Sequence, residues 1–98
     1  MGVYDAIRAY NGVISWINKN QFDLGEPKKK SHRGVDQHLN AIFRKFGQEH
    51  NLKMQKDNRP SYKGSYSPMM SNCIVIQENW KEFKEWVEKN IPKKVVNN

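Results

Sequence analysis

The chain has 98 residues, of which 37% are hydrophobic and 28% charged, and it carries a net charge of +7 at neutral pH. This composition supports one modest core and excludes wholesale disorder. No apolar run approaches the roughly 20 residues that cross a bilayer, so we expect no membrane association. A single cysteine, Cys73, excludes an internal disulfide, and Asp5 and Arg8 interrupt any signal-peptide core near the first residue. We therefore expect a cytoplasmic protein.

The first predicted element is an amphipathic helix over residues 3–18. Its apolar side chains recur at steps of four, three, four and three residues: Val3, Ile7, Tyr10, Ile14 and Ile17. Residues 19–34 lack such a period and contain Gly25 and Pro27, which predicts a loop whose basic part spans 25–34.

A second helix is predicted over residues 35–46 or a few residues beyond. Val35, Leu39, Phe43 and Phe46 line one face, and Gly47 is a plausible stop. Beyond it the periodicity becomes that of strands. Residues 52–56 alternate apolar and polar side chains, residues 62–67 follow a turn-forming stretch, and the β-branched run at 73–77 has strand length. These three segments predict a small antiparallel sheet.

The last predicted element is a helix that begins near residue 76 and ends before Pro92. Its core positions lie at steps of four, three, four and four: Ile76, Trp80, Phe83, Val87 and Ile91. Residues 1–92 then form a single domain, and residues 93–98 a frayed tail. The expected class is α+β, with three amphipathic helices packed on the small sheet. An all-α bundle with an irregular middle is the alternative.

The net charge of the chain is concentrated in one third of its length. Residues 28–63 contain ten basic and three acidic side chains, whereas the remainder carries seven of each sign. All three histidines, His32, His38 and His50, lie in the same segment. Dense cations attract polyanions because counterions are released where the cations bind. Nucleic acid is therefore the expected partner.

The candidate nucleic-acid-binding residues combine cations for phosphates with tyrosines for bases. Lysine in a loop contacts the phosphate backbone without reading sequence, and tyrosine faces stack on unpaired bases. The interleaving of arginine, lysine and tyrosine over 59–66 favours RNA or single-stranded DNA over duplex. The full set is Lys28, Lys29, Lys30, Arg33, Arg44, Lys45, Lys53, Lys56, Arg59, Tyr62, Lys63 and Tyr66.

Three other interpretations stay open. Trp16 and Trp86 lie at the edges of their helical stripes and could anchor a protein interface, which suggests an inhibitor or adaptor of a host nucleic-acid enzyme, or a homodimer. A metal-independent ribonuclease could use the histidines with Tyr62 and Arg59 or Arg44. Abundant Asn and Lys fit an AT-rich genome and a phage or mobile-element accessory protein. We expect no metal site and no cofactor, and we favour binding by occupancy over catalysis.

Overall fold

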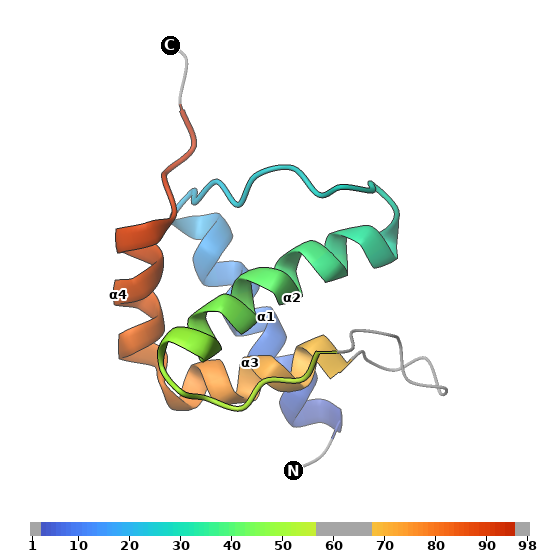
Figure 1. The fold of residues 1–98 in the computed structure, drawn as a ribbon, viewed down its shortest axis with the longest axis vertical. Helices are drawn as coiled ribbons and strands as arrows, with labels where there is room; N and C mark the ends of the chain where they lie inside the picture. Colours follow the sequence, from blue (N-terminus) through green and yellow to red (C-terminus); the bar gives the residue numbers. More distant parts are fainter. Residues whose placement is uncertain (1–2, 57–67, 96–98) are drawn as a thin grey trace.

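The computed structural model describes residues 3–56 and 68–95 and folds them into four helices (Figure 1). These are α1 (Val3–Lys19), α2 (His32–Glu49), α3 (Pro68–Glu78) and α4 (Trp80–Asn90). Within these two stretches there is no strand, and an isolated bridge between Phe22 and Lys93 is the only β-type pairing. The predicted α+β class is therefore wrong, and the all-helical alternative fits.

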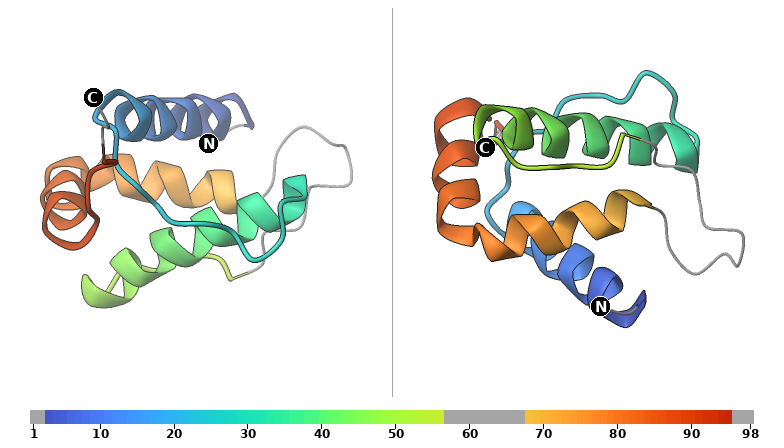
Figure 2. Two further views of the ribbon diagram at one scale, coloured as in Figure 1. Left: turned by 90° about the horizontal axis from the view of Figure 1, so that it is seen from above. Right: turned by 60° about the horizontal axis from the view of Figure 1, so that its bottom comes forward.

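The apolar run at 73–77, which was predicted to be a strand, lies in the middle of α3. Figure 2 shows α3 as a middle layer between α1 and α2, with α4 crossing one end of the stack. Cys73 and Ile76 are buried, while Ile74 and Val75 on other sides of the helix are half-buried. A helix covered on two sides needs no polar face, so its sequence loses the helical period that would identify it.

The segment at 52–56, which was predicted to be a strand, has no regular secondary structure and does not pair with a strand among the described residues. Its polar backbone atoms bind side-chain amides instead. Gln55 N donates to Asn72 Oδ1 over 2.8 Å, and Gln55 O accepts from Asn40 Nδ2 over 3.2 Å. The third predicted strand, at 62–67, lies outside the described residues.

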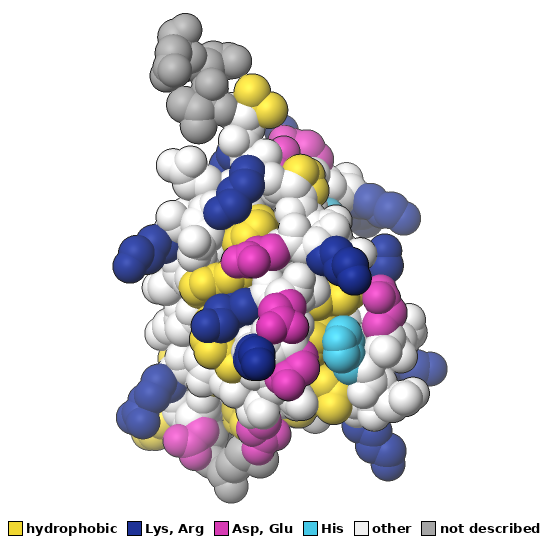
Figure 3. Space-filling model, turned by 90° about the vertical axis from the view of Figure 1, so that its left-hand side faces the viewer, with side chains coloured by type: hydrophobic (Ala, Val, Ile, Leu, Met, Phe, Trp, Pro, Cys, Tyr) yellow, Lys and Arg dark blue, Asp and Glu magenta, His cyan; other side chains and the backbone are white. Residues whose placement is uncertain are grey.

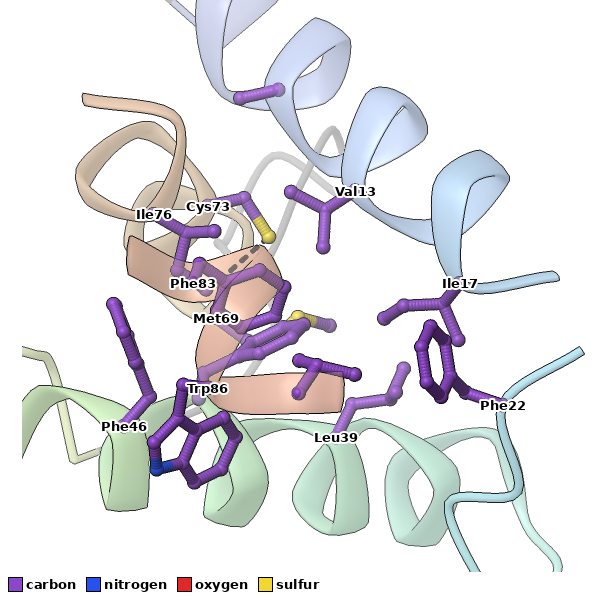
Figure 4. Close-up of a cluster of buried hydrophobic side chains, with 13 residues drawn as sticks. Val13, Ile17, Phe22, Leu39, Phe46, Met69, Cys73, Ile76, Phe83 and Trp86 are labelled. Atoms are coloured by element: carbon purple, nitrogen blue, oxygen red, sulfur yellow. Dashed lines mark hydrogen bonds between the residues drawn. The ribbon is translucent and has the colours of Figure 1, made fainter. Parts of the chain in front are cut away.

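The core lies where α1, α2 and α4 meet on α3. In Figure 4, side chains of all four helices, together with Phe22 from the loop after α1, converge on a single apolar cluster. Phe83 of α4 is at its centre: its ring lies 5.1 Å from Phe46 edge-on and 5.8 Å from Trp80 stacked. Aromatic pairs at such separations stabilise beyond their buried area, which explains why α4 closes this end of the molecule.

Helix α2 begins three residues before its predicted start and ends within its predicted range. It begins at His32 because Ser31 caps it, with Ser31 Oγ accepting from Gly34 N over 3.1 Å. It continues through Gly47, the predicted stop, to Glu49. A Cβ at position 47 would overlap Met54 and lie 3.3 Å from the carbonyl oxygen of Leu52. The glycine therefore permits close packing and does not end the helix.

The predicted C-terminal helix is divided in two at Asn79. Its side-chain amide donates to the carbonyl oxygen of Val75 over 2.9 Å, and its backbone leaves the helical region. Local side-chain bonds of this kind compete with helix continuation. As a result Ile76 belongs to α3, while Phe83 belongs to α4.

Each of the two long helices is followed, two residues after its last residue, by a residue with left-handed backbone. Gln21 has φ 57° and Asn51 has φ 56°. After α1, Phe22 N donates to Ile17 O over 3.2 Å and Gln21 N to Asn18 O over 3.1 Å, which is the pattern of a Schellman motif. The turn directs the following loop back across the molecule.

The first residues of the predicted tail are paired with that loop. Lys94 N donates to Gln21 O over 2.7 Å, and Asp23 N donates to Pro92 O over 2.8 Å. The ammonium group of Lys93 lies 4.4 Å from the centre of the Phe22 ring. These contacts join the exit of α1 to the exit of α4.

Candidate nucleic-acid interface

The outward surface of α2 is a polar stripe. Gln37, Ala41, Arg44 and Gln48 follow one another at steps of four, three and four residues, and all are exposed or half-buried. The opposite face of the helix is apolar and packs towards α3. The stripe therefore points to solvent because the core fixes the rotation of the helix.

The loop between α1 and α2 lies along one side of this stripe (Figure 1). His38 Nε2 donates to the carbonyl oxygen of Leu24 over 2.7 Å and ties the loop to the helix. Closer to the start of α2, a Cβ on Gly34 would overlap the backbone carbonyl of Lys29, so a glycine is required there. The two contacts hold the loop against α2. They leave its three lysines, Lys28, Lys29 and Lys30, exposed to solvent.

The segment at 51–56 runs along the opposite side of α2. Asn72, which is 1% exposed, accepts from Gln55 N and donates to Asn40 Oδ1 over 2.7 Å. The backbone of the segment is thereby fixed at the seam between α2 and α3. Its two lysines, Lys53 and Lys56, are exposed.

Few carboxylates are available to neutralise this surface. The acidic residues near this surface are Asp23 and Glu26 in the loop before α2, and Asp36 and Glu49 in α2. Asp36 is buried and raises the pKa of Tyr10, after the larger effect of burial of the phenol, so its charge acts on the interior. Glu49 Oε1 accepts from the indole nitrogen of Trp86 over 3.1 Å.

The α4 side of the molecule provides a contrast. Positive and negative side chains are interspersed over that face (Figure 3), and α4 itself has three lysines and three glutamates. The basic surface of α2, as we call it, consists of Lys28, Lys29, Lys30, Arg44, Lys45, Lys53 and Lys56.

Seven of the twelve predicted nucleic-acid-binding residues thus flank one helix. Arg33 lies in the first turn of α2, but its side chain is not among those described. The remaining four predicted residues lie outside the described part of the chain: Arg59, Tyr62, Lys63 and Tyr66.

The two predicted interface tryptophans lie in or against the core. Trp86 is 6% exposed and packs 5.6 Å from Phe46. Trp16 is half-buried, 5.1 Å from Phe22 and 5.4 Å from Trp80. Both rings therefore serve the packing of this chain, and Trp86 offers little surface to a partner.

The described histidines do not form a catalytic pair. His38 and His50 are twelve residues apart along α2, which separates them by about 18 Å at 1.5 Å per residue. Each ring binds a backbone carbonyl, His38 that of Leu24 and His50 that of Phe46. Residues 3–56 and 68–95 contain no group of three or more metal-ligating side chains. None of the helices in that part of the chain is long and apolar enough to cross a membrane.

Sequence reasoning missed the residues that position the basic surface. Asn40 and Asn72 are buried amides, and nothing in their spacing shows that they meet. Gln48 belongs to the outward stripe and was also missed, although the helical period of exposed positions in α2 would have indicated it. None of the protein-family models, curated proteins or solved structures compared with this chain matches it.

Proposed function

We propose that this is a small cytoplasmic protein that binds nucleic acid by occupancy, with RNA or single-stranded DNA preferred over duplex. The observation that carries the proposal is the basic surface of α2: exposed lysines held on both sides of the outward stripe of the helix. The buried Cys73 thiol is compatible with a reducing compartment.

The two rows of lysines suit a phosphate backbone. Cations on either side of α2 place a polyanion across the helix, and the amides of Gln37 and Gln48 lie between them. Lysine contacts position the strand without specifying its sequence, and glutamine can bond base edges. This arrangement supports binding with little sequence preference.

The preference for single strands depends on the stacking of bases on Tyr62 and Tyr66. This role of the two tyrosines remains a prediction from the sequence. Stacking of unpaired bases on tyrosine contributes about 1 to 3 kcal/mol per base. If these tyrosines stack on bases, alanine at either position weakens single-strand binding by about that amount and leaves duplex binding unchanged. A large loss of thermal stability in the same variant would show that the tyrosine is structural instead.

The salt dependence of binding tests the electrostatic part. Neutralising four to seven phosphates of a single strand lowers affinity by about 50- to 900-fold between 50 and 200 mM salt. Fluorescence anisotropy with a labelled 20-nucleotide RNA, the matching DNA and its duplex measures this directly. Absence of binding at 50 mM, or affinity independent of salt, contradicts the proposal.

A matched pair of triple variants then locates the interface. Glutamine at Lys28, Lys29 and Lys30 removes three charges from the basic surface and should weaken all sequences by at least 10-fold at 50 mM salt. The control K81Q/K89Q/K94Q removes the same charge from exposed positions elsewhere. It should cost less than 3-fold. Equal losses in the two variants would mean that net charge alone, and not this surface, governs binding.

The two rival functions have less support from the described residues. The interpretation as an inhibitor or adaptor depended on exposed tryptophans, but Trp86 is buried in the core. A ribonuclease using His38 and His50 requires both rings at one phosphate, which their separation along α2 prevents. Recovery of intact RNA after prolonged incubation supports binding, whereas cleavage products would favour the ribonuclease.

A further inference from the structure

A cavity of about 350 Å³ lies at the junction of the loop after α1, the second half of α2 and the end of α4. Its wall is mostly apolar and includes Leu24, Ile42, Trp86 and Ile91. Two charged side chains, Asp23 and Lys45, complete it. Cavities of this size and character bind small aromatic ligands, with the few polar groups fixing their orientation.

The walls of this cavity are held by contacts already in place. Asp23 N donates to Pro92 O over 2.8 Å, and Asp23 Oδ1 accepts from Gly25 N over 2.9 Å. The Trp86 ring is fixed by its hydrogen bond to Glu49. A ligand therefore enters a site that needs little reorganisation, which lowers the cost of binding.

The cavity is adjacent to the basic surface of α2, and this determines the class of ligand. Lys45 belongs to both. A second cavity of about 330 Å³, lined by Lys28, Lys29 and His38, lies nearer the start of α2. The loop between α1 and α2 thus lines two successive cavities, and each cavity is next to lysines that can bind phosphates.

We propose that the first cavity binds an unstacked nucleobase that carries an exocyclic amine, cytosine or adenine, of a single-stranded nucleic acid. The base lies against Ile42, Ile91 and the small exposed part of Trp86, the Asp23 carboxylate accepts from its amine, and Lys45 binds the adjoining phosphate. A carboxylate accepts from the amino group of cytosine, whereas thymine has no exocyclic amine and offers only its ring N3–H. The inference rests on the proposed function and adds a base-dependent contribution to it.

The test compares three labelled eight-nucleotide strands of equal charge: oligo(dC), oligo(dT) and an abasic strand. We expect oligo(dC) to bind roughly 5- to 100-fold more tightly than the abasic strand, because the apolar wall of the cavity removes the base from water. Oligo(dT) should fall between them. In D23N the difference between oligo(dC) and oligo(dT) should narrow, because the amide keeps the bond to Gly25 N but loses the charge.

A second readout reports on the cavity itself. In the W16F/W80F variant, Trp86 is the only tryptophan, and oligo(dC) should change its fluorescence whereas the abasic strand should not. The cavity-filling variant I42F should bind all three strands with the affinity of the abasic one. If W16F/W80F does not fold, anisotropy on the unmodified chain and on I42F still decides.

The outcomes separate the two proposals. Equal affinity for the three strands, with steep salt dependence, overturns the base site and leaves the electrostatic interface intact. Failure of all three to bind at 50 mM salt overturns both. A base preference that survives I42F places the base elsewhere and also overturns the site.

Discussion

Replacing Asn72 by alanine tests the account of how the 51–56 segment is held. The side chain is 1% exposed and makes three hydrogen bonds: it accepts from Gln55 N, and it donates to Asn40 Oδ1 and to Gln55 O. In the variant, Gln55 N and Asn40 Oδ1 lose their partners, whereas Gln55 O keeps the bond from Asn40 Nδ2.

The expected loss of stability follows from the two polar atoms, Gln55 N and Asn40 Oδ1, that no longer have a hydrogen-bond partner. Asn40 is buried, so its Oδ1 without a partner costs about 1 to 3 kcal/mol. Gln55 is exposed, so loss of the bond to its N costs about 0.5 to 1.5 kcal/mol, and N72A should lower the free energy of unfolding by about 1.5 to 4.5 kcal/mol in total. For a domain of this size the midpoint of thermal unfolding should fall by roughly 10 to 30 °C. Such a loss is a large part of the stability of a typical domain.

Urea unfolding followed by circular dichroism measures this loss. Ser71 precedes Asn72 in α3 and is half-buried, so S71A is the matched control and should change stability by less than about 0.5 kcal/mol. N40A and N40A/N72A complete a double-mutant cycle, in which the direct bond should give a coupling of about 0.5 to 3 kcal/mol. A loss below 1 kcal/mol for N72A, or strictly additive single losses, would refute the network.

Three further changes test other parts of the fold. Q21G should raise stability by about 0.5 to 1 kcal/mol in thermal melts, because glycine relieves the left-handed backbone at φ 57°; no gain would argue against that conformation. G47A should cost 1 to 3 kcal/mol by overpacking against Met54, and a neutral result would mean the 52–54 segment can move away. Burial raises the pKa of Cys73 to about 12, so a thiol reagent should modify it only as fast as the chain unfolds. Above pH 9 the thiol of Cys73 is deprotonated in the unfolded state but stays protonated in the folded state. The free energy of unfolding should therefore fall between pH 9 and 12, with a slope about 1.4 kcal/mol per pH unit steeper than that of C73A.

The parts of the fold that could be predicted from the sequence are those with one buried face. The apolar period of α1 predicts its bounds to within one residue of Val3–Lys19. Apolar residues at helical spacing, with charged residues between them, likewise predict α4. Helix α3 could not be found this way, because contact on two sides removes the period. The division at Asn79 depends on one side-chain bond to Val75, which no spacing rule reveals.

The basic surface could be predicted in composition but not in shape. Clustering of cations over residues 28–63 indicates a polyanion partner, yet it does not show that two separate segments border α2. That arrangement depends on Asn72 and on the contact of His38 with Leu24, both between residues far apart in the chain. The cavity beside Lys45 likewise needs three elements to meet.

The central position of α3 has a consequence for how the molecule opens. Among the described helices it is the one whose backbone closely approaches all three others. An eleven-residue helix with apolar groups on most sides is unstable in water by itself, so α3 forms only when its neighbours are in place. Opening of α3 therefore deprives α1 and α2 of their shared partner at the same moment. Amides deep in these three helices should exchange with solvent deuterium through one common event rather than helix by helix.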